Sequence, residues 1–131
     1  MLKKTITYTD YNGVERKQDF YFNLTKAEIM KIEMSVPGGL AEKIRRIVDA
    51  QDQPAIIEVF EDLIGKSYGV KTPEGGFKKK PEYLEDFMAT PAYDELFMEL
   101  ATDADAAAKF VNGIIPAGLD VSNAPVLAVN N

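Results

Sequence analysis

The segment from Tyr93 to Pro116 constrains the fold most, because its apolar pattern predicts two consecutive helices. Thr90 and Pro91 suit the N-cap and first turn of the first helix, and Thr102 restarts the pattern. At about 100° per residue, one apolar stripe contains Tyr93, Leu96, Phe97 and Leu100. The second helix has an apolar face formed by Ala107, Phe110, Val111 and Ile114. Pro116 prevents further helix, so this part of the chain is expected to be helical up to about residue 114.

The N-terminal segment has the alternation of a β-hairpin. Apolar and polar residues alternate from Leu2 to Tyr8, and a return strand is expected from Val14 to about Asn23. Asn12-Gly13 between them predicts a type I′ turn, in which both residues have positive φ. Because an isolated hairpin is marginal in water, we expect residues 2–24 to pack on helices or to pair with another strand, including one from a second copy.

The middle of the chain predicts four more helices. Thr25 and Glu28 form a capping box that starts a helix ending near Met34. Further helices are expected over residues 40–50, 54–66 and 81–88, and the most apolar of them, residues 54–66, is expected at the centre of a bundle. Residues 69–81, with a Gly-Gly pair and three consecutive lysines, predict a mobile loop.

These elements predict an α+β fold that is mainly α. The N-terminal hairpin is expected to pack on a bundle of about five to six helices within a single domain, residues 1–116. Residues 117–131 have no long periodicity and are expected to form an extended or disordered tail.

Composition narrows the possible functions. The 131 residues include neither Cys nor His, which removes thiolate metal sites, disulfides and the commonest general base. The net charge of −6 argues against binding nucleic acid through bulk electrostatics. No apolar run has signal-peptide length or approaches the roughly 20 residues of a membrane span, so a cytoplasmic protein is expected.

The acidic and hydroxyl groups do not predict a catalytic or metal site. Asp94, Glu95 and Glu99 suit the solvated face of a helix, and Asp103 and Asp105 suit the first turn of the next one. Ser67 and Tyr68 have no histidine to activate a nucleophile and no Gly-x-Ser-x-Gly elbow. We therefore expect no catalytic residues, no metal ligands, no cofactor and no enzymatic activity.

The glycine and lysine segment allows two interpretations. Gly75-Gly76 followed by Lys78, Lys79 and Lys80 could contact phosphate, nucleic acid or an acidic protein. The P-loop pattern Gly-x-x-x-x-Gly-Lys-Ser/Thr is absent, and a solvated loop is the simpler interpretation.

Methionines provide the candidate binding surface. Methionine is adaptable and frequent at promiscuous binding surfaces, and Met98 lies off the main stripe of its helix. One interpretation is a hydrophobic groove for a partner helix, and the other is core filling. The candidate partner-binding residues are Met30, Met34, Met88, Phe97 and Met98.

Two stretches carry a resemblance to a known family. ITYTDYNGVERKQDFYFNLTKAEI near the start and FMELATDADAAAKFVNGIIP, ending at Pro116, resemble the tail assembly chaperones of siphophages that infect Gram-positive hosts. The resemblance spans about Ile6 to Pro116 and implies a protein without catalytic residues.

The resemblance implies specific partners. Family members look like the short, G-like product of a frameshift pair. They bind the hydrophobic tape measure protein and keep it soluble, and a longer frameshifted form recruits the tail tube protein. Self-association, action in the host cytoplasm and absence from the mature virion are implied as well. The alternative is a small phage regulatory or nucleic-acid-binding protein that uses the lysine-rich loop.

Overall fold

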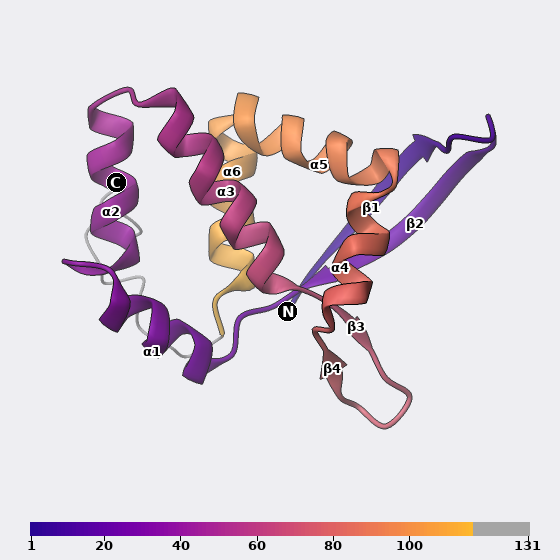
Figure 1. Cartoon of the computed structure of the whole chain (residues 1–131), viewed down its shortest axis with the longest axis horizontal. Coiled ribbons are helices and arrows are strands. Elements are labelled where there is room, and N and C mark those ends of the chain that lie inside the picture. Colours follow the sequence, from indigo (N-terminus) through magenta and orange to yellow (C-terminus); the bar gives the residue numbers. More distant parts are fainter. Residues whose placement is uncertain (117–131) are drawn as a thin grey trace.

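The computed structural model describes residues 1–116 and has an N-terminal β-hairpin followed by six helices in this range. The hairpin strands, β1 (Leu2–Thr9) and β2 (Glu15–Phe22), extend beyond the helices at one end (Figure 1). The helices are α1 (Lys26–Ser35), α2 (Gly39–Asp49), α3 (Gln53–Ser67), α4 (Pro81–Met88), α5 (Pro91–Thr102) and α6 (Ala104–Ile114). The expected α+β fold with a hairpin on a helix bundle is confirmed. The expected tail, residues 117–131, lies outside the described residues, and the single-domain division at residue 116 stays a prediction.

The hairpin turn differs from the expected type I′ turn. Only Gly13 has a positive φ, 81°, whereas Asn12 does not. The Asp10 carboxylate accepts hydrogen bonds from the N–H groups of Asn12 and Val14, both at 2.9 Å. This side chain therefore favours a longer turn, and the last strand pair is Thr9 with Glu15.

The segment expected to be a loop, residues 69–81, instead contributes to the sheet. Strands β3 (Tyr68–Lys71) and β4 (Phe77–Lys78) extend it to four strands in the order β1-β2-β3-β4. Strand β3 pairs with β2 through Phe22 opposite Tyr68. Gly69 fits because a Cβ there would lie 2.7 Å from Cε2 of Phe77. Only residues 72–76 form a connecting turn, and the mobility of the segment stays a prediction.

The core forms where one face of the hairpin meets the helices. Ile6 and Tyr8 of β1 are buried on the same face as Phe22 of β2, which is fully buried. Phe22 contacts Phe110 of α6 edge-on, with ring centroids 5.4 Å apart. The other aromatic side chains at this junction are Phe20, Tyr68 and Phe87. This aromatic cluster fixes the sheet against α4 and α6.

Helix α3 supplies the centre of the bundle, as its composition predicts. Leu63 and Ile64 are almost completely buried, and α3 runs diagonally across Figure 1. Ser67 is also fully buried, and its hydroxyl donates to the carbonyl of Leu63 at 2.6 Å. Within residues 1–116, no helix combines the length and apolar character needed to cross a membrane.

Candidate functional site

The described residues form an apolar groove of about 700 Å³, which we call the α2–α6 groove. Its α2 wall consists of Ile44, Ile47 and Val48. Helix α3 contributes Ile56, Val59 and Phe60. Helix α6 contributes Ala104, Ala107, Ala108 and Val111, and Leu100 and Ala101 come from the end of α5. Charged and hydroxyl side chains at its rim are Arg45, Asp49, Thr102 and Asp105.

The local sequence explains why the α2–α6 groove is open. Alanine side chains consist of only a methyl group. Ala104 and Ala108 therefore leave a depression on α6 where it lines the groove with α2 and α3. On α2, Ile44 and Ile47 are half-buried, and Val48 is 54% exposed. The apolar stripe of α2 is thus incompletely covered by the described residues. An incompletely covered apolar stripe is suited to binding another apolar surface.

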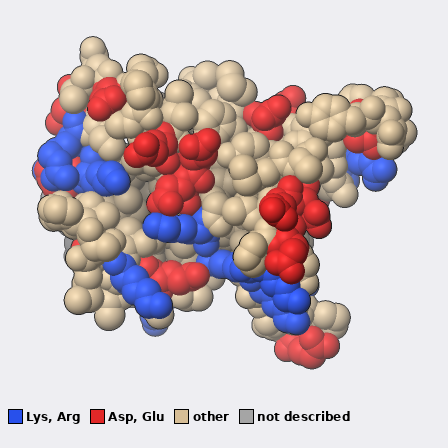
Figure 2. Space-filling view, in the orientation of Figure 1, with Lys and Arg blue, Asp and Glu red and all other residues tan. Residues whose placement is uncertain are grey.

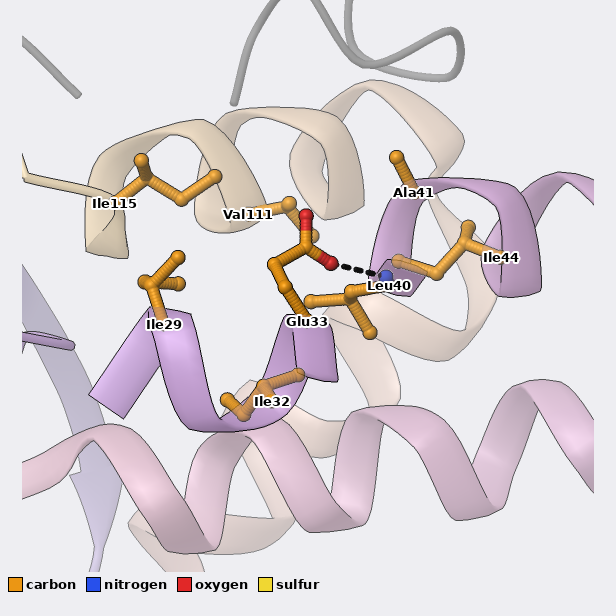
Figure 3. A pocket seen from close by; sticks show the side chains of 8 residues that line it. All are labelled: Ile29, Ile32, Glu33, Leu40, Ala41, Ile44, Val111 and Ile115. Atoms are coloured by element: carbon orange, nitrogen blue, oxygen red, sulfur yellow. Dashed lines mark hydrogen bonds between the residues drawn. The ribbon is translucent and has the colours of Figure 1, made fainter. Parts of the chain in front are cut away.

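A second cavity adjoins the groove. It has a volume of about 10 Å³, roughly the space of one water molecule, and is too small for a ligand. Figure 3 shows Glu33 reaching across it, where its carboxylate accepts a hydrogen bond from the N–H of Leu40 at the start of α2. Ile44 and Val111 line both this cavity and the α2–α6 groove, so the two are neighbours separated by these side chains.

The predicted methionine surface is exposed but lies elsewhere. Met30, Met34, Met88 and Met98 are between 47% and 82% exposed, so the core-filling interpretation is wrong for these four. They lie on α1, α4 and α5, and none lines the α2–α6 groove. Phe97 is half-buried, with its ring stacked on Tyr93 at 6.0 Å. A role of these five residues in binding stays a prediction.

Sequence reasoning missed the groove residues Ile44, Ile47 and Val48. Their helical spacing was visible, but it indicates only that one face of α2 is apolar. The alanines of α6 were a second indication of a groove, because small side chains either allow a neighbouring helix to approach closely or leave a depression beside it. Which of these occurs depends on where α2 and α6 lie relative to each other.

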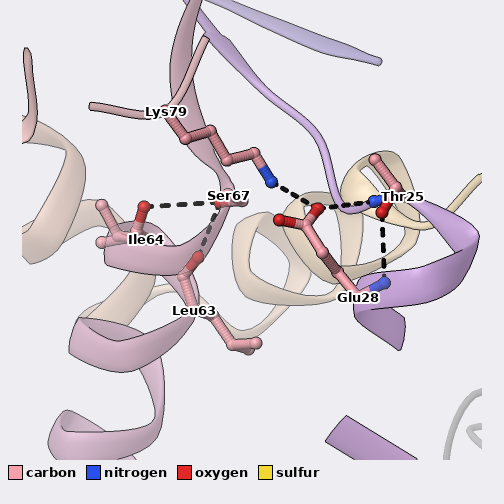
Figure 4. Close-up of polar contacts among 6 residues, drawn as sticks. All are labelled: Thr25, Glu28, Leu63, Ile64, Ser67 and Lys79. Atoms are coloured by element: carbon pink, nitrogen blue, oxygen red, sulfur yellow. Dashed lines mark hydrogen bonds and ion pairs between the residues drawn. The ribbon is translucent and has the colours of Figure 1, made fainter. Parts of the chain in front are cut away.

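The lysine-rich segment is engaged by its own chain. The ammonium group of Lys79 lies 2.6 Å from Oε1 of Glu28 (Figure 4). Lys71 lies over the ring of Tyr21 at 4.8 Å, and Lys80 is 5.7 Å from the centre of the Tyr83 ring. Figure 2 shows the basic side chains of the β3–β4 region beside acidic ones. This arrangement weakens the case for a phosphate-binding loop.

The acidic candidates have structural roles. Asp103, expected in the first turn of α6, is instead its N-cap, and its carboxylate accepts from the N–H groups of Asp105 and Ala106. Glu99 pairs with Lys4 of β1 at 2.8 Å. Asp94 and Glu95 are exposed. Among the described residues, no group of three or more acidic side chains is placed to hold a metal ion.

A comparison with known protein families shows which family the chain belongs to. A family model described as phage tail assembly chaperone matches residues 1–125, which includes the hairpin and all the helices that form the groove. The chain belongs to the phage tail assembly chaperone family. Comparisons with curated proteins and with solved structures gave no match. Membership of this chaperone family implies protein partners in tail assembly.

Proposed function

We propose that this chaperone binds the tape measure protein of a siphophage and keeps it soluble, and that the α2–α6 groove is its client site. A longer frameshifted form then helps to recruit the tail tube protein. This work takes place in the host cytoplasm, and the chaperone is not part of the mature virion. Family membership supports a role in tail assembly. The apolar lining and open shape of the groove are the reason for proposing it as the binding surface.

The shape of the groove fits a helical client. A tape measure protein is expected to be long, helical and apolar on one side, so its stripe recurs at i, i+3, i+4 and i+7. The α6 wall from Ala104 to Val111 spans about 10 Å, at a rise of 1.5 Å per residue, which corresponds to about two turns of a client helix. One groove therefore covers only a short stretch, and coating a long client requires many copies.

The exposed methionines offer a second contact surface. Met98 on α5 and Met30 on α1 are both more than half exposed and do not contribute to the groove. A client helix held in the α2–α6 groove leaves these side chains available for a neighbouring turn of client or for another chaperone copy. We retain Met30, Met34, Met88, Phe97 and Met98 as candidate partner-binding residues on this basis.

Co-expression with the tape measure protein of the same phage tests the proposal. The client is expected to be insoluble alone and soluble with the chaperone, and the two should co-elute in size-exclusion chromatography. A client that stays insoluble while the chaperone elutes alone would remove the proposal.

The alternative, nucleic-acid binding through the lysine-rich segment, has a separate test. Phosphate contacts weaken steeply with salt, so a DNA-binding titration at two salt concentrations would reveal them. Because Lys79 is paired with Glu28, and Lys71 and Lys80 lie over tyrosine rings, we expect no salt-dependent binding.

A further inference from the structure

We propose that the outer edge of strand β1, on the side away from β2, pairs with the same edge of a second copy of this chain. The two strands run antiparallel, so that two four-stranded sheets join into one. The contact goes beyond the proposed function, because it forms between two chaperone copies and does not rest on the client or on the α2–α6 groove. Three features of β1 support it: the direction of its backbone groups, its regularity and the charges at the two ends of the hairpin.

The hydrogen bonds of the hairpin show which backbone groups of β1 face outward. At the turn, the N–H of Asp10 donates to the carbonyl of Val14 at 2.9 Å, so these two residues form a hydrogen-bonded pair. Such pairs alternate along an antiparallel ladder, and the residues between them direct their N–H and C=O groups away from the partner strand. The strand register therefore assigns outward groups to Lys3, Thr5, Thr7 and Thr9. We call these backbone groups the β1 edge.

The far side of β2 supports the same assignment. By the alternation that starts at Asp10, Phe22 and Leu2 form a hydrogen-bonded pair, so the backbone groups of Phe22 face β1. Asn23, the next residue, donates its N–H to the carbonyl of Ser67 at 2.8 Å, on the side of β3. Successive residues of a strand direct their backbone groups to opposite sides, so both ends of the hairpin give the same alternation.

The β1 edge is long, regular and exposed. Strand β1 is the first in the order β1-β2-β3-β4, and within residues 1–116 no strand pairs with its outer side (Figure 1). All eight residues of β1 pair with β2 without a bulge, and the strand contains no proline. The four residues of the β1 edge are exposed. Proteins usually protect an edge strand with proline, a bulge or a very short strand, and β1 has none of these.

The β1 edge is complementary to itself in antiparallel orientation. With a two-fold axis at Ile6, Lys3 of one copy lies opposite Thr9 of the other, and Thr5 lies opposite Thr7. All outward groups of both copies then face one another, and each opposite pair can exchange two hydrogen bonds. A shift by two residues in either direction would leave outward groups without partners at the ends. Because both copies use the same surface, the contact closes as a two-fold dimer.

Charges at the two ends of the hairpin favour this orientation over a parallel one. Glu15 lies opposite Thr9 on β2, so in the dimer it is one strand away from Lys3 of the second copy. Strands lie about 4.8 Å apart, so these two Cα atoms would be about 10 Å apart, within reach of two long side chains. Among the described residues, neither Lys3 nor Glu15 forms an ion pair. Parallel pairing would instead bring Lys3 of both copies together, and like charges repel.

A contact made by one strand from each copy is small. It falls at the low end of the interface sizes seen in stable complexes, where association is weak and transient. We therefore expect a dimer that forms and dissociates with protein concentration. Copies held close together on one client would pair more completely, because their effective concentration is higher.

Disulfide formation between two copies of different size tests the pairing, because the chain contains no cysteine. Thr5→Cys in one copy and Thr7→Cys in the other would place the two Cα atoms about 5.5 Å apart, which suits a disulfide. The matched control combines Thr5→Cys with Lys17→Cys, because Lys17 is exposed and lies opposite Thr7 on β2. Its Cα would be about 10 Å from position 5, beyond the range of a disulfide. Melting curves verify that all three variants are folded.

The proposal predicts that the disulfide between positions 5 and 7 forms at least about tenfold faster than the one between positions 5 and 17. The reason is that pairing of the two strands raises the effective concentration of the first two thiols. Equal rates at the same protein concentration would overturn the inference.

An exchange of charges tests the antiparallel register, with sedimentation velocity at several protein concentrations as the measurement. Lys3→Glu should weaken the dimer about fivefold or more, because it brings two carboxylates together at each end of the contact. Adding Glu15→Lys should restore dimerisation to within about twofold of the wild type. Within one copy the two positions are six residues apart along the hairpin, about 20 Å, so this rescue can arise only between copies. A wild-type chain that is monomeric at every concentration, or a double variant as weak as Lys3→Glu alone, would overturn the inference.

Both experiments use the chaperone without tape measure protein, which separates this inference from the proposed function. Failure of the copies to pair, with client binding retained, would remove only the inference. Pairing of copies that leave the client insoluble would support the inference and remove only the proposed function.

Discussion

Lys79 Nζ lies 2.6 Å from Glu28 Oε1, although the two residues are 51 positions apart in the chain. The same carboxylate oxygen accepts from the N–H of Thr25 at 2.8 Å, and Thr25 Oγ1 accepts from the N–H of Glu28 at 3.1 Å. Glu28 therefore completes the capping box of α1 and also connects this helix to the segment before α4 (Figure 4). One side chain thus joins the helical half of the molecule to the β3–β4 region.

Replacing Glu28 by Gln should remove the pairing while keeping the cap, because glutamine also serves in a capping box. Burial alone would raise the pKa of Glu28, but hydrogen bonds from Lys79 and from the Thr25 backbone hold it below the ordinary value of 4.5. A lowered pKa in the folded state stabilises the fold above the unfolded pKa, and this contribution is lost as pH falls through the folded value. Urea unfolding should therefore show the variant about 0.5–1 kcal/mol less stable at neutral pH, since the pair is partly exposed.

The difference between wild type and Glu28→Gln should shrink at a pH well below 4.5. In a Lys79→Met background, the same substitution should have little effect at any pH. A difference that persists in that background would mean that Lys79 is not the partner that matters in solution.

Two glycines should respond in opposite directions to alanine. Gly65 lies inside α3, and a Cβ there would meet only Leu84 Cδ2, at 3.5 Å. Gly65→Ala should therefore raise the free energy of unfolding by about 0.5–1 kcal/mol through helix propensity. At Gly69, a Cβ would lie 2.7 Å from Phe77 Cε2 and 2.8 Å from the carbonyl of Lys78. Gly69→Ala should lower the free energy of unfolding by about 1–3 kcal/mol.

Urea midpoints of the two alanine variants measure this contrast directly. Gly65→Ala acts as the control for the general effect of adding a methyl group. If Gly69→Ala were as stable as the wild type, the close approach of β4 to β3 would be contradicted.

Met98 tests the second proposed contact surface. This residue is 56% exposed, so Met98→Asp should change stability by no more than about 0.5 kcal/mol. A charge there should nevertheless reduce the fraction of tape measure protein that co-elutes with the chaperone, because a buried carboxylate without a partner is costly. Met98→Leu, which keeps an apolar side chain, should preserve co-elution. Equal co-elution of the Asp and Leu variants would exclude Met98 from the binding surface.

Features encoded by neighbouring residues could be predicted from the sequence. The start of α1 follows from the capping box at Thr25, and the start of α4 follows from Pro81, because both signals act within one turn. The hairpin was predicted from alternation on either side of Gly13. Its turn type was wrong because the Asp10 side chain bonds the turn backbone, which a two-residue motif does not show.

Features that depend on distant parts of the chain could not be predicted. Strands β3 and β4 have only four and two residues, and β3 pairs with β2, where Gly69 lies opposite Tyr21 and Tyr68 lies opposite Phe22, far earlier in the chain. The α2–α6 groove needs the relative placement of Val48 on α2 and Ala108 on α6, two helices that are far apart in the sequence. The methionines were chosen because methionine is adaptable and frequent at binding surfaces, and only the exposure of Met98 was indicated by its position off the helical stripe.

The central claim is that the α2–α6 groove binds the client, and a matched pair of charge substitutions tests it most directly. Val48 lines the groove and is 54% exposed, whereas Val14 lies beside the hairpin turn and is 50% exposed. Val48→Asp and Val14→Asp therefore introduce the same charge at similarly exposed positions, and both should leave stability nearly unchanged.

The measurement is the amount of soluble tape measure protein that co-elutes with each variant after co-expression. The account predicts that Val48→Asp weakens client affinity at least about tenfold, which corresponds to about 1.4 kcal/mol of binding free energy, and that less client co-elutes as a result. Val14→Asp should match the wild type. Equal co-elution of the two variants, with both folded, would contradict the assignment of the groove as the client site.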